Sequence, residues 1–221
     1  MTPRELLGSA IVPGGGEQLR LFRRGDDYMI VLDRNELMNS RMSGSEQALA
    51  VMSIERLGNR AAHVLIGGYG MGYTLRASLD AMSAEGKITV VELVPEIVTW
   101  AKGPMKELTA GCLDDARVEL VIGDVADAIA TGRYDAILLD VDNGPDGLTR
   151  ASNDRLYSPR GLAAAKAALR PGGILAIWSA APDRAFTQAL AEAGFAVDEV
   201  AVRARSNGKG AKHVIWFATN R

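Results

Sequence analysis

Short apolar runs alternate with segments of helical periodicity along the chain from residue 63 onward. The predicted strands are His63–Ile66, Ile88–Glu92, Arg117–Ile122, Tyr134–Asp140 and Ile174–Trp178. Apolar residues recur at helical spacing between them, over Tyr73–Ser83, Pro95–Leu108, Val125–Ala130, Pro159–Leu169 and Asp183–Ala193. Nearly continuous apolar strands separated by crossover helices are typical of a parallel sheet covered on both faces. The pattern therefore predicts an α/β fold with a doubly wound, mostly parallel sheet.

The two ends of the chain follow a different pattern. Phe195–Ala204 and Ala211–Thr219 are strand-like runs joined by a turn-rich segment, which predicts a hairpin and an antiparallel C-terminal strand. Gln18–Arg23 and Tyr28–Leu32 flank another turn and predict a small N-terminal β-hairpin, and Ser45–Leu57 predicts a helix that leads into the main sheet. We expect an N-terminal unit over residues 1–57 and the sheet domain over residues 58–221.

Composition narrows the class of function. The 221 residues include 25 Lys and Arg against 27 Asp and Glu, so the chain lacks the basic excess of a general nucleic-acid binder. One cysteine, Cys112, and two histidines, His63 and His213, predict neither a disulfide framework nor a metal site. The sequence shows no basic leader before an apolar run and no run of about 18 apolar residues. We expect a cytoplasmic protein that binds neither nucleic acid nor a membrane.

A glycine-rich segment follows the first predicted strand. His63-Val-Leu-Ile-Gly-Gly-Tyr-Gly-Met-Gly leads from a buried strand through a turn into a helix. Glycines let the backbone approach a ligand closely, and the N-terminus of the helix offers free N–H groups. A dinucleotide fingerprint would place a small third residue at position 73, where the chain has Tyr73. The segment therefore predicts a nucleoside or nucleotide site other than one for NAD, against the alternative of a tight structural turn.

Carboxylates follow the next two strands. Glu92 ends the second strand, 20 positions after Gly72, where a carboxylate can accept hydrogen bonds from ribose hydroxyls. Asp124 ends the third strand, where it can face an adenine amino group or cap the following helix. The two roles of Asp124 are compatible, and a solvated strand end is the alternative for Glu92.

An acidic cluster follows the fourth strand. Asp140, Asp142 and Asn143 come at the strand's carboxyl end, at the edge where open α/β sheets bind ligands. A carboxylate there can hold or deprotonate an attacking amine if its environment raises its pKa. The alternative is turn chemistry, because Asp-Asn-Gly-Pro favours a bend on its own.

These motifs together resemble the spermidine synthase family, the aminopropyltransferase branch of the class I S-adenosylmethionine-dependent methyltransferase fold. The matching segments are Val64-Leu-Ile-Gly-Gly, Val90-Val-Glu-Leu, Arg117-Val-Glu-Leu-Val-Ile-Gly-Asp, Tyr134-Asp-Ala-Ile-Leu-Leu-Asp, Leu156-Tyr and Leu169-Arg-Pro-Gly-Gly. The resemblance implies a Rossmann-like domain that binds S-adenosylmethionine or its decarboxylated form as a co-substrate, without a metal. It also implies a small amine-bearing substrate and a possible homodimer.

The resemblance assigns roles to individual residues. Asp140 matches the family's catalytic aspartate. The predicted cofactor-binding residues are Gly67, Gly68, Tyr69, Gly70, Gly72, Glu92, Gly123 and Asp124. The predicted substrate-binding residues are Asp142, Asn143, Tyr157 and Glu46.

Three motifs depart from the family pattern. The family's G-G-G-D-G-G has an aspartate that holds the donor's aminopropyl ammonium, and this chain has Gly70 there. The usual D-S-S-D-P becomes Asp140-Val-Asp-Asn-Gly, and Tyr-His-Glu becomes Gly-Ser-Glu, which keeps only Glu46. An aspartate at position 70 would attract the ammonium of the decarboxylated donor and repel the carboxylate of S-adenosylmethionine.

The absence of that aspartate predicts methyl transfer from S-adenosylmethionine to a small amine-bearing molecule, with Asp140 orienting or deprotonating the nucleophile. Two alternatives stay open. One is a divergent polyamine aminopropyltransferase that uses decarboxylated S-adenosylmethionine. The other is a nucleoside-binding module without transfer activity.

Overall fold

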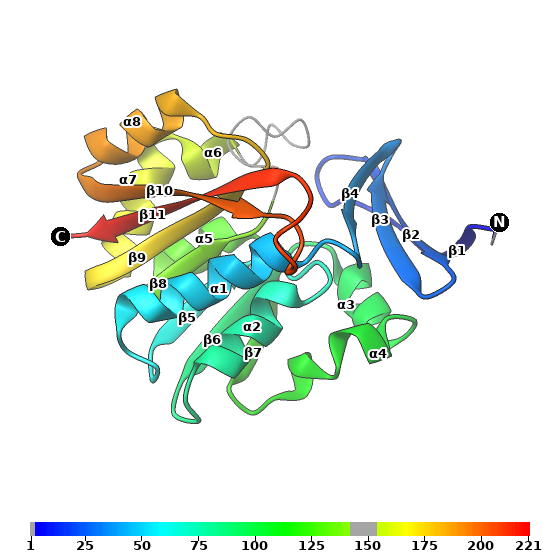
Figure 1. Cartoon of the computed structure of the whole chain (residues 1–221). Helices are drawn as coiled ribbons and strands as arrows, with labels where there is room; N and C mark the ends of the chain where they lie inside the picture. The colour runs from blue at the N-terminus through cyan, green and yellow to red at the C-terminus, as the bar shows by residue number, and fades with distance from the viewer. Residues whose placement is uncertain (1–2, 142–153) are drawn as a thin grey trace.

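The main body of the protein is a seven-stranded sheet. The computed structural model describes residues 3–141 and 154–221. The sheet has the strand order β10-β11-β9-β8-β5-β6-β7 (Figure 1). Its strands are β5 (His63–Gly67), β6 (Lys87–Glu92), β7 (Val118–Ile122), β8 (Tyr134–Leu139), β9 (Leu169–Ser179), β10 (Phe195–Arg203) and β11 (Lys212–Asn220). The strands from β5 to β9 are parallel, and β11 lies antiparallel between β9 and β10. The predicted mostly parallel sheet with an antiparallel C-terminal strand is confirmed.

Helices cover both faces of this sheet. They are α1 (Gly44–Leu57), α2 (Tyr73–Ala81), α3 (Pro95–Lys102), α4 (Lys106–Thr109), α5 (Val125–Thr131), α6 (Asp154–Tyr157), α7 (Pro159–Ala168) and α8 (Arg184–Glu192), with a short 3-10 turn at Cys112–Asp114. Alternate strand residues enter two cores: Ile66 packs in the core that includes α1 and α2, and Leu65 packs in the core that includes α5, α7 and α8. This alternation explains why the strands are apolar throughout.

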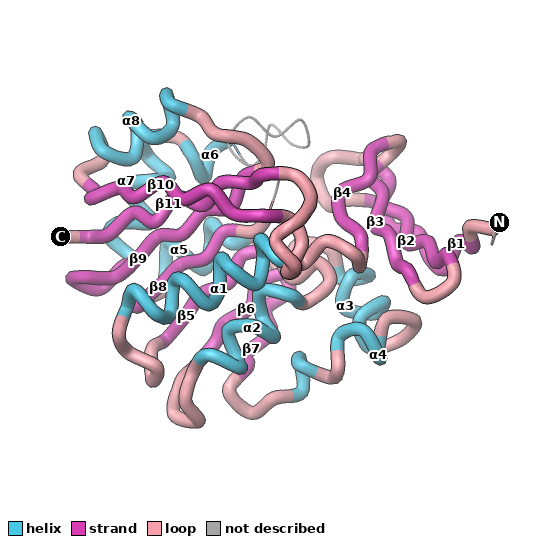
Figure 2. Tube along the Cα trace, viewed as in Figure 1, coloured by secondary structure: helices cyan, strands magenta, loops and turns pink. Residues whose placement is uncertain are grey.

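The N-terminal unit is a four-stranded antiparallel sheet in the order β1-β2-β3-β4 (Figure 2). The predicted hairpin corresponds to β2 (Gln18–Arg24) and β3 (Asp27–Leu32), and β1 (Glu5–Ile11) and β4 (Asn35–Asn39) add a strand on each side. The sequence predicted only a two-stranded hairpin here, and the structure has four strands. Neither outer strand shows clean apolar alternation, because β1 carries a bulge between Leu6 and Gly8 and the register of β4 also shifts.

Two predicted segments have different bounds. The helix expected over Pro95–Leu108 is broken into α3 and α4 at Gly103-Pro104, because a proline lacks the N–H of a helical bond and disfavours helical backbone at the preceding residue. The fifth parallel strand begins at Leu169, five residues before the predicted start. Its register against β8 shifts between Tyr134 and Ala136, so the glycine-containing segment remains in the sheet.

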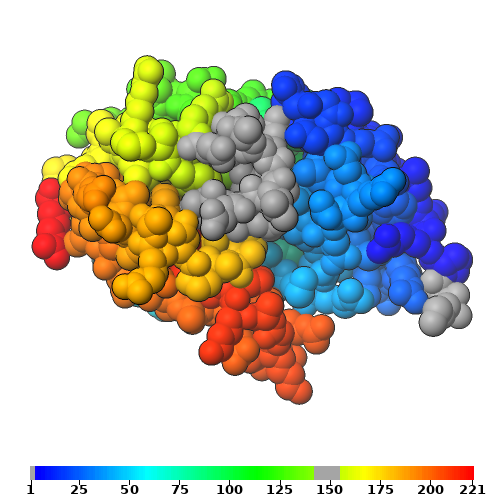
Figure 3. Space-filling model, turned by 90° about the horizontal axis from the view of Figure 1, so that it is seen from above, coloured from blue at the N-terminus to red at the C-terminus, as the bar shows by residue number. Residues whose placement is uncertain are grey.

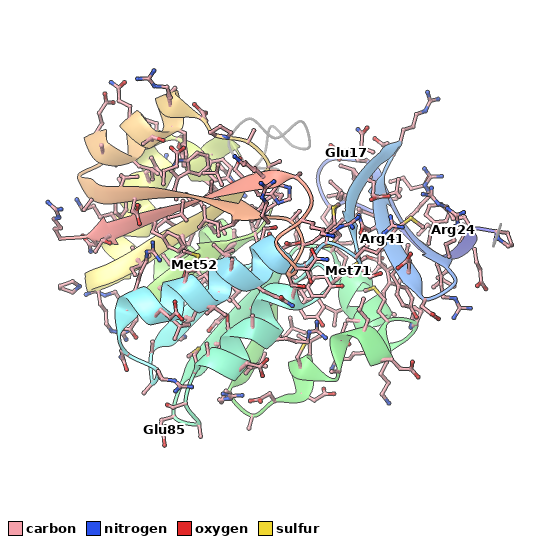
Figure 4. The ribbon with its side chains drawn as sticks, in the orientation of Figure 1. Glu17, Arg24, Arg41, Met52, Met71 and Glu85 are labelled. Carbon is pink, nitrogen blue, oxygen red and sulfur yellow. The ribbon has the colours of Figure 1, made fainter. Side chains whose placement is uncertain are left out.

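The N-terminal sheet forms one side of the molecule and lies near the carboxyl ends of the parallel strands (Figures 1 and 3). Arg41 lies in the connection from β4 to α1, where the two sheets meet (Figure 4). Helix α1 packs against α2 and β9 of the large sheet. Because α1 packs on the large sheet, its contacts do not mark a boundary after residue 57, and the predicted division into residues 1–57 and 58–221 stays a prediction. Among the described residues, no helix has the length and apolar character needed to cross a membrane.

Candidate active site

A cavity of about 180 Å³ lies between the N-terminal sheet and the carboxyl edge of the large sheet. Leu19, Ile30 and Met38 line it from the small sheet. Gly68 and Asp140, which follow β5 and β8, line it from the large sheet. Strand β5 pairs with β6 on one side and β8 on the other, so the chain reverses its winding direction at this point. Such switch points hold the ligands of open α/β sheets.

The glycine loop follows β5 and depends on left-handed backbone. Gly68 has φ +85°, and a Cβ atom there would collide with the carbonyl oxygen of Asp140. The absence of that atom lets the loop pass directly beside the end of β8. Gly68 and Gly70 line the cavity, while Gly67 lies in β5 and Gly72 caps α2. The loop fits the close approach that a nucleoside needs.

Glu92 fixes this loop from the end of β6. The N–H of Tyr69 donates to Glu92 Oε2 at 2.9 Å, and the N–H of Val94 donates to Oε1 at 2.8 Å. Burial raises the pKa of Glu92, while these backbone donors act in the opposite direction. Glu92 also lines the cavity, so its remaining acceptor sites can meet ribose hydroxyls.

Asp124 caps the helix that follows β7. Its Oδ1 accepts the N–H of Ala126 at 2.8 Å, and its Oδ2 forms an ion pair with Arg155. The capping role is present, and the contact with adenine stays a prediction. Gly123 also lines the cavity, and its N–H donates to the carbonyl oxygen of Glu92 at 2.9 Å.

Two further acidic side chains line the cavity. Asp140 follows β8 and Glu46 lies in the first turn of α1; both line the cavity. Thr74 Oγ1 donates to Asp140 Oδ2 at 2.7 Å. Burial raises the pKa of Asp140 to about 6, and burial together with the charge of Asp140 raises the pKa of Glu46 to about 7. The two carboxyl groups therefore hold a proton more tightly than exposed carboxyl groups do.

Thr74 was missed by the sequence reasoning, and Met38, which lines the cavity, was not among the predicted site residues. Thr74 is buried in the first turn of α2 after the glycine loop, and its place in that turn was the only signal for it. Met38 comes from β4, and a Cβ atom at Gly70 would lie 2.9 Å from its Sδ and Cε atoms. Met38 thus occupies the space where the family's aspartate would project.

The side chains of two predicted site residues contact neighbours that are not among the residues lining the cavity. The Tyr69 hydroxyl lies 3.4 Å from Cys112 Sγ, so only its backbone takes part in the glycine loop. The ring of Tyr157 packs edge-on against Phe186 with 5.6 Å between the ring centroids. The substrate contact of Tyr157 stays a prediction. Asp142 and Asn143 lie outside the described residues.

The charged side chains that line the cavity share one sign. Glu46, Glu92, Asp124 and Asp140 are the charged residues among the described ones that line it, and no Lys, Arg or His is in that set. Within residues 3–141 and 154–221, no cluster of three or more His, Cys, Asp or Glu side chains could hold a metal ion. The cavity is suited to ligands with positive charge.

The family comparison agrees with this geometry. The spermine/spermidine synthase domain matches residues 46–189, which include the glycine loop, Glu92, Asp124 and Asp140. The chain belongs to the spermine/spermidine synthase family. Spermidine synthase from Thermotoga maritima superposes with a TM-score of 0.75 over 98% of this chain and 73% of its own, at 20% identity. That match shows a shared fold, including the N-terminal sheet.

Two relatives by sequence are polyamine aminopropyltransferases. The polyamine aminopropyltransferase of Mycobacterium tuberculosis (strain ATCC 25618 / H37Rv) is 29% identical over 171 residues, which are 75% of this chain and 31% of that protein. Polyamine aminopropyltransferase 2 of Hyperthermus butylicus is 35% identical over 121 residues, which are 54% of this chain and 38% of that protein. The chain thus spans about a third of the length of these curated relatives.

Proposed function

We propose that this family member transfers an aminopropyl group from decarboxylated S-adenosylmethionine to a small amine. The observation that carries the proposal is the acidic cavity, in which the charged lining residues among those described are four carboxylic acids. The decarboxylated donor has a sulfonium and an ammonium and no carboxylate, and an amine acceptor adds another cation. Both substrates match the sign of the cavity.

The donor's nucleoside fits the glycine loop at the carboxyl edge of the sheet. Glu92 would accept hydrogen bonds from the ribose, and Gly123 and Asp124 would lie near the adenine. Two apolar residues also line the cavity: Val91 near the end of β6 and Val125 at the start of α5. They would pack against the base. These contacts leave the sulfonium end to face Asp140 and Glu46.

The chemistry requires a free amine and a place for its proton. The nitrogen lone pair attacks the aminopropyl carbon bound to sulfur, and the carbon–sulfur bond breaks with its electrons going to sulfur. The products are methylthioadenosine and a secondary ammonium, which loses a proton. Asp140 can take this proton because burial raises its pKa toward neutral. Holding the two substrates in line supplies the rest of the acceleration.

Methyl transfer from S-adenosylmethionine is the second candidate, and Gly70 is the observation that favours it. The family's relatives favour aminopropyl transfer instead. The structure also weakens the argument from Gly70, because the other cavity carboxylates would repel the carboxylate of S-adenosylmethionine even without an aspartate at position 70.

The nucleoside product distinguishes the candidates. The protein is incubated with each donor and a panel of diamines and monoamines, and the released nucleoside is identified by chromatography. Aminopropyl transfer predicts methylthioadenosine from the decarboxylated donor. Release of S-adenosylhomocysteine would show methyl transfer, and tight donor binding without release of either nucleoside would support the non-catalytic module.

A further inference from the structure

A hydrogen-bonded chain leads from Glu46, which lines the cavity, through Ser45 to His213. Ser45 Oγ donates to Glu46 Oε2 at 2.7 Å and lies 2.9 Å from His213 Nδ1. Ser45 is fully buried and Glu46 is 7% exposed, whereas His213 is partly exposed. The chain therefore connects a buried acid on the cavity to a group that solvent reaches.

The fold brings these three residues together from distant positions. Ser45 and Glu46 lie in the first turn of α1, and His213 lies near the start of β11, 168 residues after Ser45. The N–H of Gly44 donates to the carbonyl oxygen of Ala204 at 2.9 Å, which attaches the start of α1 to the end of β10. The ring of Trp178 packs edge-on against His213 with 4.8 Å between centroids and fixes the imidazole orientation.

We propose that Ser45 and His213 form a proton relay between Glu46 and solvent. The proposal rests on the proposed function, because aminopropyl transfer releases one proton in each turnover. Asp140 and Glu46 face the same cavity, and bound substrates displace the water that could otherwise accept this proton. An acid that accepts a proton must lose it before the next turnover, and the route through Ser45 avoids the filled cavity.

Protons move through the relay in one concerted transfer. The hydrogen bond from Ser45 Oγ to Glu46 Oε2 belongs to the Glu46 carboxylate, and it reverses when Glu46 is protonated. Protonated Glu46 then donates its proton to Ser45 Oγ while the Ser45 hydroxyl donates its own proton to His213 Nδ1.

The imidazolium then releases its Nε2 proton to solvent, which leaves a Glu46 carboxylate and neutral His213 in the Nδ1–H form. Proton exchange with solvent at the partly exposed ring returns His213 to the Nε2–H form when Glu46 next takes up a proton. Burial lowers the pKa of His213, so the ring gives up its proton readily near neutral pH. Ser45 and His213 act through Glu46 and are positioning residues.

Other groups around the relay set its charge environment. The titratable or charged residues on the elements packed around it include Asp140 after β8, Tyr73 on α2, Arg203 on β10 and Lys212 at the start of β11, with Arg205 and Lys209 in the β10–β11 turn. The charge of Asp140 raises the pKa of Glu46, so a proton that Asp140 accepts from the substrate passes to Glu46 across the cavity that both residues line. The relay therefore starts from a protonated acid.

Nuclear magnetic resonance of the imidazole nitrogens tests the connection without turnover. The chain has two histidines, so both can be assigned, and His63 bonds to Thr89 Oγ1 at 3.1 Å as an internal control. We expect neutral His213 to change from the Nε2–H to the Nδ1–H tautomer as Glu46 loses its proton. Ser45→Ala and Glu46→Gln should each abolish this change, and His63 should behave alike in all proteins. A His213 tautomer that is constant with pH in the wild type overturns the relay.

Turnover tests whether the reaction uses the connection. His213→Asn keeps a polar group near Ser45 but cannot carry a proton, so kcat should fall about tenfold or more with the donor KM unchanged. Ser53→Ala is the matched control, because Ser53 is also fully buried on α1 and its hydroxyl donates to the Leu49 carbonyl of the same helix at 2.6 Å. Wild-type kcat in both His213→Asn and Ser45→Ala would show that protons leave by another route. If the wild type transfers no group at all, the proposed function fails while the tautomer experiment still decides the connection.

Discussion

The side chain of Met38 covers Gly70, the loop residue at which the family pattern has an aspartate. Met38 belongs to β4 of the N-terminal sheet, so the small sheet supplies part of the wall at the position predicted for the donor's tail. Loss of the aspartate is thus accompanied by an apolar side chain in its space. The proposed selection of the decarboxylated donor therefore rests on the charge of the whole cavity.

Restoring the aspartate should strengthen selection for the decarboxylated donor. Gly70→Asp adds a negative charge that attracts the donor's ammonium and repels the carboxylate of S-adenosylmethionine, and we expect the affinity ratio to move by about 1–3 kcal/mol. Gly70 has φ +54°, so the substitution also costs about 1–2 kcal/mol of backbone strain. Titration calorimetry of both donors against both proteins measures the ratio, from which a common loss cancels.

Met38→Ala is the matched background for this variant. It removes the atoms that a side chain at position 70 would meet, so Met38→Ala/Gly70→Asp should recover stability while keeping the changed donor ratio. The same donor ratio in wild type, Gly70→Asp and the double variant would place the donor's tail away from Gly70.

Glu92→Gln should weaken donor binding and loosen the glycine loop together. The amide keeps one acceptor oxygen but turns an N–H₂ group toward a backbone donor, either Tyr69 or Val94. We expect about 1.5–3 kcal/mol less donor affinity and about 1–2 kcal/mol less stability. Calorimetry and denaturant unfolding measure the two losses. A folded variant with wild-type donor affinity would remove Glu92 from the site.

Asp140→Asn should affect turnover more than binding. The amide has similar size but cannot accept the acceptor's proton, so kcat should fall by about 10²–10⁴ while the donor affinity changes little. Thr74→Val removes only the hydrogen bond to Asp140 Oδ2 and should lower kcat by a smaller factor, about tenfold. Steady-state kinetics with an identified acceptor measures kcat for both variants and the wild type. Equal kcat in Asp140→Asn and wild type would leave Asp140 as a structural residue of the turn.

Glu46 should make the protein less stable as the pH rises. Its pKa in the folded chain is raised from 4.5 to about 7, so the folded state binds its proton more tightly than the unfolded state does. The resulting stabilisation is full below pH 4.5 and is lost as the pH rises through about 7. Glu46→Gln should therefore match the wild type at low pH and exceed its unfolding free energy by about 1–3 kcal/mol at pH 8. Denaturant unfolding across this range checks it, and parallel pH profiles would contradict it.

Local patterns were sufficient for the large sheet. Buried parallel strands such as Val64–Gly67 are apolar on both faces, and the glycines and Glu92 follow strand ends whose position the pattern fixes. The small sheet was underestimated because β1 and β4 gain their pairing from β2 and β3 and carry little pattern of their own. The break in the helix at Pro104 had a local signal that the helical periodicity outweighed.

Contacts across the fold were beyond the sequence. The pairs Met38 with Gly70 and Ser45 with His213 join separate elements, and only the packing of α1 and the small sheet on the large one brings them together. The sequence predicted S-adenosylmethionine as the donor, and the proposal now takes its decarboxylated form for the same reason. Gly70 alone favours S-adenosylmethionine, whereas the assembled cavity adds the charge of Asp140 near the predicted place of the donor's tail.

A competition between the two donors tests the central claim most directly. Equimolar S-adenosylmethionine and decarboxylated S-adenosylmethionine are supplied with one accepted amine, and mass spectrometry measures which group the amine gains, with Asp140→Asn as the parallel control. The acidic cavity predicts an aminopropylated amine as the main product and a much slower reaction in Asp140→Asn. A methylated amine as the main product would contradict the account.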